Sequence, residues 1–209
     1  MKISNLRLAL LALSLATLSS AASAQFYVGG GVGTSKSTGF NGTTAVTATT
    51  NATVTGDKNQ TSWKLYGGYQ FTPTWGLEAQ YANLGNRSVP FTFSGAVVGT
   101  GTASARAQQF SLAATGTLPL SNNFYLMGKL GASRNSIGTI SGSVGTVSFT
   151  SNGTNKTDLL AGVGVGYNFN KNWGARVEYE NFGKFSSNGG VNGNAIKADN
   201  WSISVKYAF

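Results

Sequence analysis

The feature that most constrains this chain is an alternation of apolar and polar residues that recurs along most of its length. Near the carboxyl end, Trp201, Ile203 and Val205 alternate with two serines and a lysine, and residues 173–180 alternate in the same way. Successive side chains of a β-strand point to opposite faces, so each segment has one apolar and one polar face. No segment beyond the first 24 residues shows helical periodicity. The pattern therefore predicts an all-β protein.

Eight alternating segments are predicted as strands, near residues 25–34, 61–71, 75–85, 105–118, 123–134, 157–169, 173–182 and 198–209. Three of their connections are tight turns. The other four are long and rich in Gly, Ser, Thr and Asn, near residues 35–60, 86–104, 135–156 and 183–197. Alternating short and long links are typical of barrels in the bacterial outer membrane. We predict an eight-stranded antiparallel up-and-down transmembrane β-barrel with short periplasmic turns and long extracellular loops.

Composition narrows the class of protein further. Charged residues make up only 10% of the 209 residues, against about 25% in soluble proteins. There is no cysteine and no histidine, which removes disulfide frameworks, thiolate metal sites and Ser-His-Asp catalysis. A soluble sandwich or lipocalin-like barrel is the alternative, with its apolar face inside. In hydrocarbon, where every backbone polar group must be paired, a chain without spanning helices needs a closed barrel.

Two groups of side chains favour the membrane barrel. The polar faces carry four cations and three carboxylates that can nearly neutralise one another in a barrel interior: Lys64, Glu78, Lys129, Arg176, Glu178, Glu180 and Lys206. The apolar faces carry aromatic residues beside the short turns and the termini: Phe26, Phe71, Trp75, Phe124, Tyr167, Phe169 and Trp173. Aromatic girdles at a membrane interface explain that placement, whereas a water-facing surface does not.

The first 24 residues are predicted to be a secretory signal peptide. Lys2 and Arg7 precede an apolar run at 8–18, and small residues lead to a cleavage site after Ala24. The alternative is an ordinary buried helix. The apolar run is shorter than the roughly 20 residues that a spanning helix needs. We therefore expect a signal peptide at 1–24 and one outer-membrane barrel domain at 25–209.

An internal repeat supports this organisation. Residues 68–85 and 166–183 share a Gly-Tyr pair, a Phe, a Trp-Gly pair, a later Tyr, an Asn and a closing Gly. Each copy is predicted to be a strand–turn–strand hairpin. Duplication and convergence on one girdle chemistry both explain the repeat.

At these residues, and at Phe26-Tyr27-Val28-Gly29 in the first strand, the chain resembles the OmpA-like transmembrane domain and the related porin-family and OmpX/Ail-type barrels. The resemblance covers nearly all of 25–209. It implies an interior network of charged pairs that plugs the lumen, and Glu78, Lys129, Arg176 and Glu178 match that network. Gly31, Thr115 and Gly166 stand where the family has charged residues, so one of its alternative ion pairs is missing.

The carboxyl-terminal strand resembles the signal read by the outer-membrane assembly machinery. Phe209 is a terminal aromatic residue, and Tyr207 and Val205 precede it at alternate positions. A plain lipid-facing strand end is the other interpretation, and both can hold together.

The long links carry most of the remaining charge, namely Lys36, Lys58, Arg87, Arg106, Arg134, Lys156, Lys184 and Lys197. A basic collar at the external rim would suit lipopolysaccharide phosphates through charge-assisted hydrogen bonds. Ordinary solvated loop charge is the alternative. Residues 86–104 and 135–156 also alternate internally, so we expect hairpins that continue as strands above the membrane and expose edges for a partner strand.

These features predict a non-enzymatic protein of the bacterial cell outer membrane with a structural and surface-interaction role, adhesin-like and in contact with lipopolysaccharide. An extracellular protein partner is left open. We expect a monomer with no cofactor, metal or nucleic-acid partner. Enzymes built on such barrels rely on a catalytic histidine, and Glu178 and Glu180 fit an ionic network better than paired-carboxylate chemistry. The alternative function is a narrow pore, because inner-face glycines such as Gly29, Gly68 and Gly166 supply little filling volume.

Overall fold

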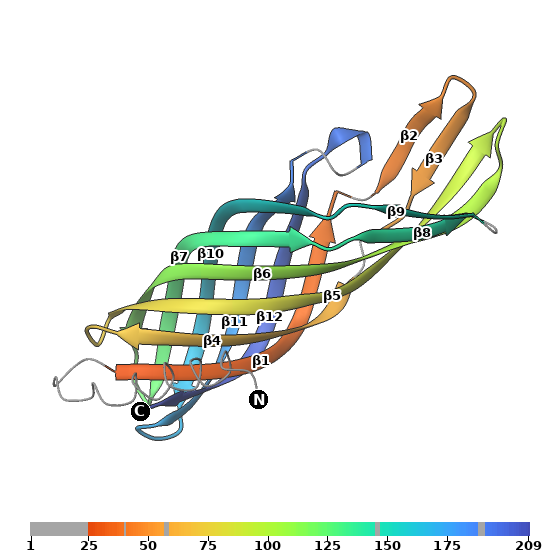
Figure 1. Cartoon of the computed structure of the whole chain (residues 1–209). Helices are drawn as coiled ribbons and strands as arrows, with labels where there is room; N and C mark the ends of the chain where they lie inside the picture. Colours follow the sequence, from red (N-terminus) through yellow and green to blue (C-terminus); the bar gives the residue numbers. More distant parts are fainter. Residues whose placement is uncertain (1–24, 40, 57–58, 145–146, 188–190) are drawn as a thin grey trace, which may run out of the picture.

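The computed structural model describes residues 25–39, 41–56, 59–144, 147–187 and 191–209, and the predicted signal peptide lies outside them. Eight long strands form the body: β1 (Gln25–Thr38), β4 (Asn59–Gln70), β5 (Trp75–Gly95), β6 (Gly99–Pro119), β7 (Phe124–Ile137), β10 (Thr154–Asn168), β11 (Trp173–Ser186) and β12 (Ile196–Ala208). Each pairs antiparallel with the next in that order, and β12 pairs with β1. The ring is therefore closed, as Figure 1 shows. The predicted eight-stranded up-and-down barrel is confirmed.

The alternation of the sequence places apolar side chains on the outside of this barrel. Val177 and Ile203 are 47% and 57% exposed, whereas Arg176, next to Val177 in the chain, is 3% exposed. A water-soluble barrel would reverse this arrangement. The apolar outer face and the charged lumen are what a membrane-spanning barrel requires. No helix among the described residues is long and apolar enough to cross a membrane.

Three short turns lie at one end of the barrel, and side-chain hydrogen bonds stabilise two of them. The Thr72 hydroxyl accepts the backbone N–H of Trp75 at 2.9 Å, and the Asn170 side-chain oxygen accepts that of Trp173 at 2.8 Å. Such side-chain bonds replace a backbone turn bond and favour Thr and Asn at these positions. Both ends of the barrel domain lie at this same end, because the Gln25 amide donates to the Phe209 carbonyl at 3.0 Å. We call it the short-turn end.

The repeat also encodes a β-bulge in each copy. The backbone N–H of Gly85 donates to the Asn83 side chain at 3.0 Å, and that of Gly183 donates to Asn181 at 2.9 Å. Both glycines have positive φ, +87° and +68°, which favours glycine at a bulge. The strand register shifts at both places. Beyond the first bulge the facing of β5 is reversed, so that Arg87 points inward.

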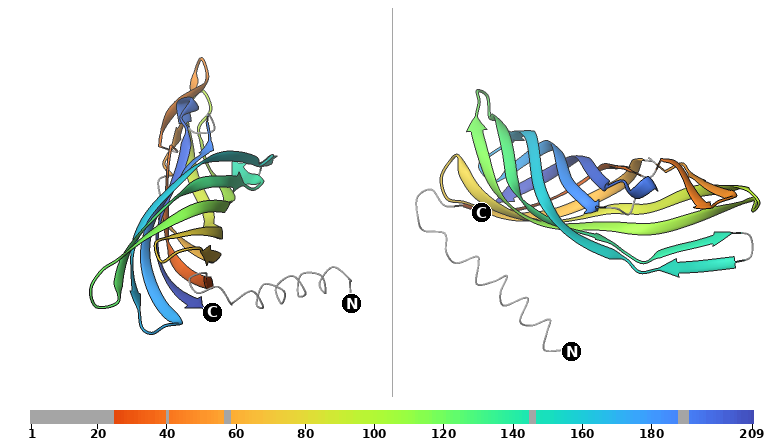
Figure 2. Two further views of the ribbon diagram at one scale, coloured as in Figure 1. Left: turned by 90° about the vertical axis from the view of Figure 1, so that its left-hand side faces the viewer. Right: turned by 90° about the horizontal axis from the view of Figure 1, so that it is seen from above.

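At the opposite end the long links contain strands of their own. β5 and β6 continue far past the barrel and pair as far as Phe93 and Gly99. Two hairpins join them, namely β2 (Gly42–Thr47) with β3 (Thr50–Val54), and β8 (Ile140–Val144) with β9 (Val147–Ser151). β3 pairs with β5 and β8 pairs with β6, so β2-β3-β5-β6-β8-β9 form an outer sheet that extends from the barrel (Figure 2). A short 3₁₀ helix, η2 (Val191–Gly193), lies between β11 and β12.

The outer sheet accords with the strands expected in 86–104 and 135–156. Within 86–104 the strand pairing leaves only residues 96–98 as a connection. The hairpin within 35–60 was not expected. Its threonines and alanines alternate without an apolar face, and its pairing with β5 depends on a segment more than 30 positions away.

Candidate functional site

Six of the seven predicted interior charges form one ionic network across the lumen. Lys64 Nζ lies 2.5 Å from Glu178 and 2.9 Å from Glu180. Lys129 Nζ lies within 2.9 Å of all three carboxylates, and Arg176 reaches two of them at 2.8 and 2.9 Å. The members come from four strands, β4, β5, β7 and β11, and are Lys64, Glu78, Lys129, Arg176, Glu178 and Glu180.

This network is electrically balanced, with three cations and three carboxylates. Each of its side chains is at most 2% exposed. Charges removed from water are tolerated only when they are well paired, because their desolvation costs several kcal/mol per ion. The lumen therefore holds a compact set of ions that ties distant strands together.

Lys206 stands apart from the network. It has no carboxylate partner within 4.0 Å among the described residues, and its Nζ lies 5.7 and 5.2 Å from the ring centroids of Tyr27 and Tyr125. Cations are attracted to aromatic faces at such distances, but far more weakly than to a carboxylate in the interior. The structure thus brings together six of the seven predicted residues and leaves Lys206 next to tyrosines.

Tyrosine rings occupy the space that the inner-face glycines leave. A Cβ added at Gly29, Gly68 or Gly166 would lie 2.0 to 2.3 Å from a ring carbon. The rings belong to Tyr66, Tyr27 and Tyr125, respectively. The glycines themselves supply little filling volume, as predicted, but the tyrosine rings of neighbouring strands lie over them and occupy that space. The observation weighs against the pore alternative.

A second, apolar layer fills the lumen on the far side of the network from the short turns. Its largest fully buried members are Leu84, Leu160, Phe182 and Phe185, to which Ile196 is added at 5% exposure. Leu84 and Phe182 sit in the two β-bulges of the repeat, and the Phe182 carbonyl accepts bonds from Ser133 and Asn135 at 2.9 and 2.6 Å. The second half of each copy of the repeat contains one of these two residues, Leu84 or Phe182, and could have indicated the layer. Sequence reasoning did not use it to predict interior residues.

The predicted aromatic residues lie on the outer face at the short-turn end: Phe26, Phe71, Trp75, Phe124, Tyr167, Phe169 and Trp173. Many of their rings pack against each other or against Tyr69 and Tyr207 in tilted or edge-on geometry, with ring centroids 4.5 to 5.5 Å apart. Sequence reasoning missed a second outer row, formed by Trp63, Tyr81, Phe110, Tyr179 and Trp201. The signal was present, because Tyr81 follows Trp75 by six residues on the same face, about 20 Å along a strand.

Five of the basic residues predicted for the rim face outward, level with this second aromatic row or just beyond it. We call them the basic belt: Lys36, Arg106, Arg134, Lys184 and Lys197. Arg134 pairs in register with Phe110, and Lys197 lies four residues beyond Trp201 on the same strand. The belt therefore borders the apolar band at the long-loop end.

The other three rim residues do not join the belt. Arg87 is only 6% exposed, and its Nη2 donates to the Ser35 hydroxyl at 2.8 Å inside the barrel. The prediction that Arg87 lies at the external rim is wrong, because the bulge at Gly85 reverses which residues of β5 face inward. Lys156 is half-buried and bonds to the Ser187 hydroxyl. Lys58 lies outside the described residues.

The predicted assembly signal lies on the outer face at the short-turn end. Val205 and Phe209 are 47% and 58% exposed. Tyr207 packs between Trp173 and Phe209, with ring centroids 4.9 and 5.2 Å away. This position suits both a lipid-facing strand end and a recognised terminal strand.

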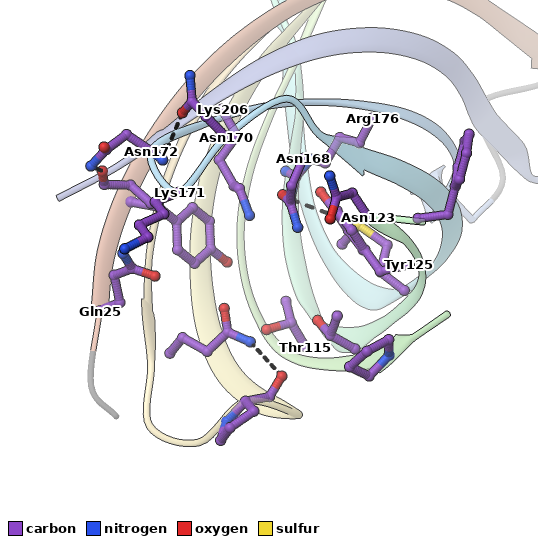
Figure 3. Close-up of a pocket in the computed structure, with 18 of the residues that line it drawn as sticks. Gln25, Thr115, Asn123, Tyr125, Asn168, Asn170, Lys171, Asn172, Arg176 and Lys206 are labelled. Atoms are coloured by element: carbon purple, nitrogen blue, oxygen red, sulfur yellow. Dashed lines mark hydrogen bonds between the residues drawn. The ribbon is translucent and has the colours of Figure 1, made fainter. Parts of the chain in front are cut away.

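Two cavities flank the filled lumen. The first, which we call the vestibule, has a volume of about 580 Å³ and opens between the short turns (Figure 3). Its lining is mainly polar and includes Tyr125, Arg176 and Lys206. The second has a volume of about 290 Å³, is mainly apolar, and lies between the apolar layer and the outer sheet near Phe91 and Ile140.

A closed ring of eight strands, an apolar outer surface between two aromatic rows and an ionic lumen define a small β-barrel of the bacterial outer membrane. The short turns then lie on the periplasmic side and the outer sheet lies outside the cell. Residues 7–209 match the sequence profile of the outer membrane protein beta-barrel domain, and the chain belongs to that family.

Solved structures of outer-membrane proteins share the fold. Ail of Yersinia pestis, in complex with the heparin analogue sucrose octasulfate, is 17% identical with a TM-score of 0.54, covering 90% of this chain and 99% of Ail. OprG of Pseudomonas aeruginosa is 17% identical with a TM-score of 0.57, covering 90% and 96%. Neisserial surface protein A is 14% identical with a TM-score of 0.50, covering 88% and 97%. Curated proteins gave no match. At such identities the similarity shows the fold alone.

Proposed function

We propose that this protein is a non-enzymatic surface-interaction protein of the outer membrane, anchored in lipopolysaccharide and adhesin-like in its external part. The observation that carries the proposal is the outer sheet. Six strands extend beyond the barrel and end in two edge strands, β2 and β9, each paired with a strand on one side only among the residues that the structure describes. An exposed edge presents unpaired N–H and C=O groups, which are a template for a strand from another protein.

The composition of the edges suits such pairing. β2 reads Gly-Thr-Thr-Ala-Val-Thr and β9 reads Val-Ser-Phe-Thr-Ser. Neither contains the proline or lysine residues with which many proteins block their sheet edges. Both carry β-branched residues that fit a pleated surface.

The basic belt supports the lipopolysaccharide part of the proposal. Its side chains follow the aromatic row that marks the outer interface, the level at which lipid headgroups lie. Lys and Arg bind phosphate through charge-assisted hydrogen bonds. A sulfated sugar is bound to Ail in its solved structure. That ligand is also a polyanion, which makes sucrose octasulfate a useful competitor for the belt.

The external part is tested by shortening it. A variant in which residues 41–56 and 140–151 are replaced by short Gly-Ser links keeps all eight barrel strands. Bacteria displaying the full protein should adhere to host cells or matrix in larger numbers than bacteria displaying this variant. Both proteins must show the heat-dependent shift in electrophoretic mobility of a folded barrel. Equal adhesion by the two strains would reject the adhesin-like role.

The belt is tested separately with the substitutions Arg134→Ser and Lys197→Ser. We expect the double variant to bind lipopolysaccharide about a hundredfold more weakly, since each of the two lost hydrogen bonds to a charged group contributes roughly 1.5 kcal/mol. Thr74→Glu combined with Ser121→Glu is the matched control, because it lowers the net charge by the same two units at exposed positions of the periplasmic turns. Equal losses in both variants would show that net charge alone, and not the belt, governs binding.

A further inference from the structure

The vestibule has the features of an anion-binding site. We infer that it binds one small oxyanion, of the phosphate or carboxylate class, from the periplasmic side, held by Arg176, Lys206 and Tyr125. This goes beyond the proposed function, which concerns the other end of the molecule.

The seven predicted interior charges do not balance, because they include one more cation than carboxylates. All three interior carboxylates form ion pairs with Lys64, Lys129 and Arg176, and each carboxylate contacts two or three of these cations. Lys206 is therefore one positive charge in excess. Its side chain lines the vestibule and is only partly exposed, so an uncompensated charge there is less well hydrated than on the open surface. A bound anion would supply the missing counter-charge.

Two buried hydrogen-bond donors belong to residues that line the vestibule, and neither donor has a partner within the described part of the chain. Nη2 of Arg176 and the hydroxyl of Tyr125 are buried and have no hydrogen-bond partner among the residues that the structure describes. The two residues are 3% and 6% exposed. Buried polar groups are nearly always hydrogen-bonded, so we expect each of these unpaired donors to have an acceptor. Both residues line the vestibule, as Lys206 does (Figure 3).

The side chains that line the vestibule suit a negatively charged ligand. Besides Arg176 and Lys206, the lining includes Lys171 and the side-chain amides of Asn123, Asn168 and other Asn and Gln residues, and no Asp or Glu belongs to the described lining. Ammonium, guanidinium, phenol and amide donors converging without a carboxylate suit an oxyanion, which accepts several hydrogen bonds at once. The volume of about 580 Å³ leaves room for such an anion together with water.

Two neighbours keep these donors available. Met127 and the Tyr66 ring pack against the Arg176 guanidinium, the ring centroid lying 3.7 Å from its central carbon. Thr115, also in the lining, is small enough not to fill the cavity. The guanidinium is thus held by Glu78, Glu178 and Tyr66, while its Nη2 has no hydrogen-bond partner among the described residues.

The test is calorimetric titration of the folded protein in detergent with inorganic phosphate and, in parallel, with acetate, at constant ionic strength. We expect saturable binding of at least one anion with a stoichiometry near one, and the stronger of the two identifies the preferred class. Lys206→Met should weaken that binding at least tenfold. Tyr125→Phe, which removes only the hydroxyl, should weaken it several-fold.

Lys156→Met is the matched control, because Lys156 is half-buried at the opposite end and lies outside the basic belt. Its affinity should equal that of the unmodified protein. Absence of saturation with both anions would overturn the inference, as would unchanged affinity in Lys206→Met. Neither result bears on the belt or the outer sheet, so failure here is distinct from failure of the proposed function.

Discussion

Lys129 is the residue on which the ionic network most depends, and Lys129→Met is the most informative perturbation. Lys129 Nζ contacts Glu78, Glu178 and Glu180 at 2.9, 2.7 and 2.9 Å. Without it, two cations face three carboxylates and the network carries a net negative charge. Methionine keeps a similar length without the charge.

The magnitude follows from these contacts. Removing one partner of a buried ion pair costs about 3–5 kcal/mol, because the remaining charge is left without compensation. Each of the three carboxylates here keeps at least one other cation, so we expect the lower end, about 3 kcal/mol. That corresponds to a shift of roughly two orders of magnitude in the folding equilibrium.

Reversible urea unfolding in lipid vesicles, followed by tryptophan fluorescence, measures this loss. Trp63, Trp75, Trp173 and Trp201 all lie on the exposed outer face, so their emission reports the transfer from lipid to water. Lys206→Met is the internal control, since Lys206 has no carboxylate partner. In phosphate-free buffer its free energy of unfolding should change by less than about 1 kcal/mol. Similar losses in the two variants, or a negligible loss for Lys129→Met, would refute the reasoning.

Two further outcomes follow from the packing of the lumen. Gly166→Ala should destabilise the barrel by about 1–3 kcal/mol in the same assay, because the new Cβ would lie 2.0 Å from the Tyr125 ring; Gly128→Ala, with only a carbonyl at 3.9 Å, should be nearly neutral. Planar-bilayer recordings should show no steady conductance, because the network and Phe182 fill the lumen. A regular conductance in single-channel records would instead support the narrow pore.

The charge pattern shows how far sequence reasoning reaches. Lys64, Glu78 and Lys129 were predictable as interior residues, since strict alternation fixes the face of every residue until a bulge intervenes. Which cation pairs with which carboxylate was not predictable, because the pairs join strands up to 116 positions apart. The isolation of Lys206 and the vestibule beside it emerged only from that three-dimensional pairing.

Arg87 and the inner glycines show where local pattern misleads. One positive-φ glycine at position 85 reverses the facing of the residues that follow it, and the sequence signals this only through the Asn-x-Gly similarity of the two repeats. Gly166 has no side chain of its own, so its contribution to filling depends on Tyr125, a residue of the neighbouring strand.

By itself, the sequence determined the membrane-facing architecture: period two makes strands, one apolar face per strand requires lipid outside, and alternating link lengths set the topology. These are properties of residues near each other in the chain. Tertiary structure alone decided the balance of buried charges, the filling of the lumen and the outer sheet. Those depend on which strands become neighbours after the ring closes, and closure joins β1 to β12, the two ends of the barrel domain.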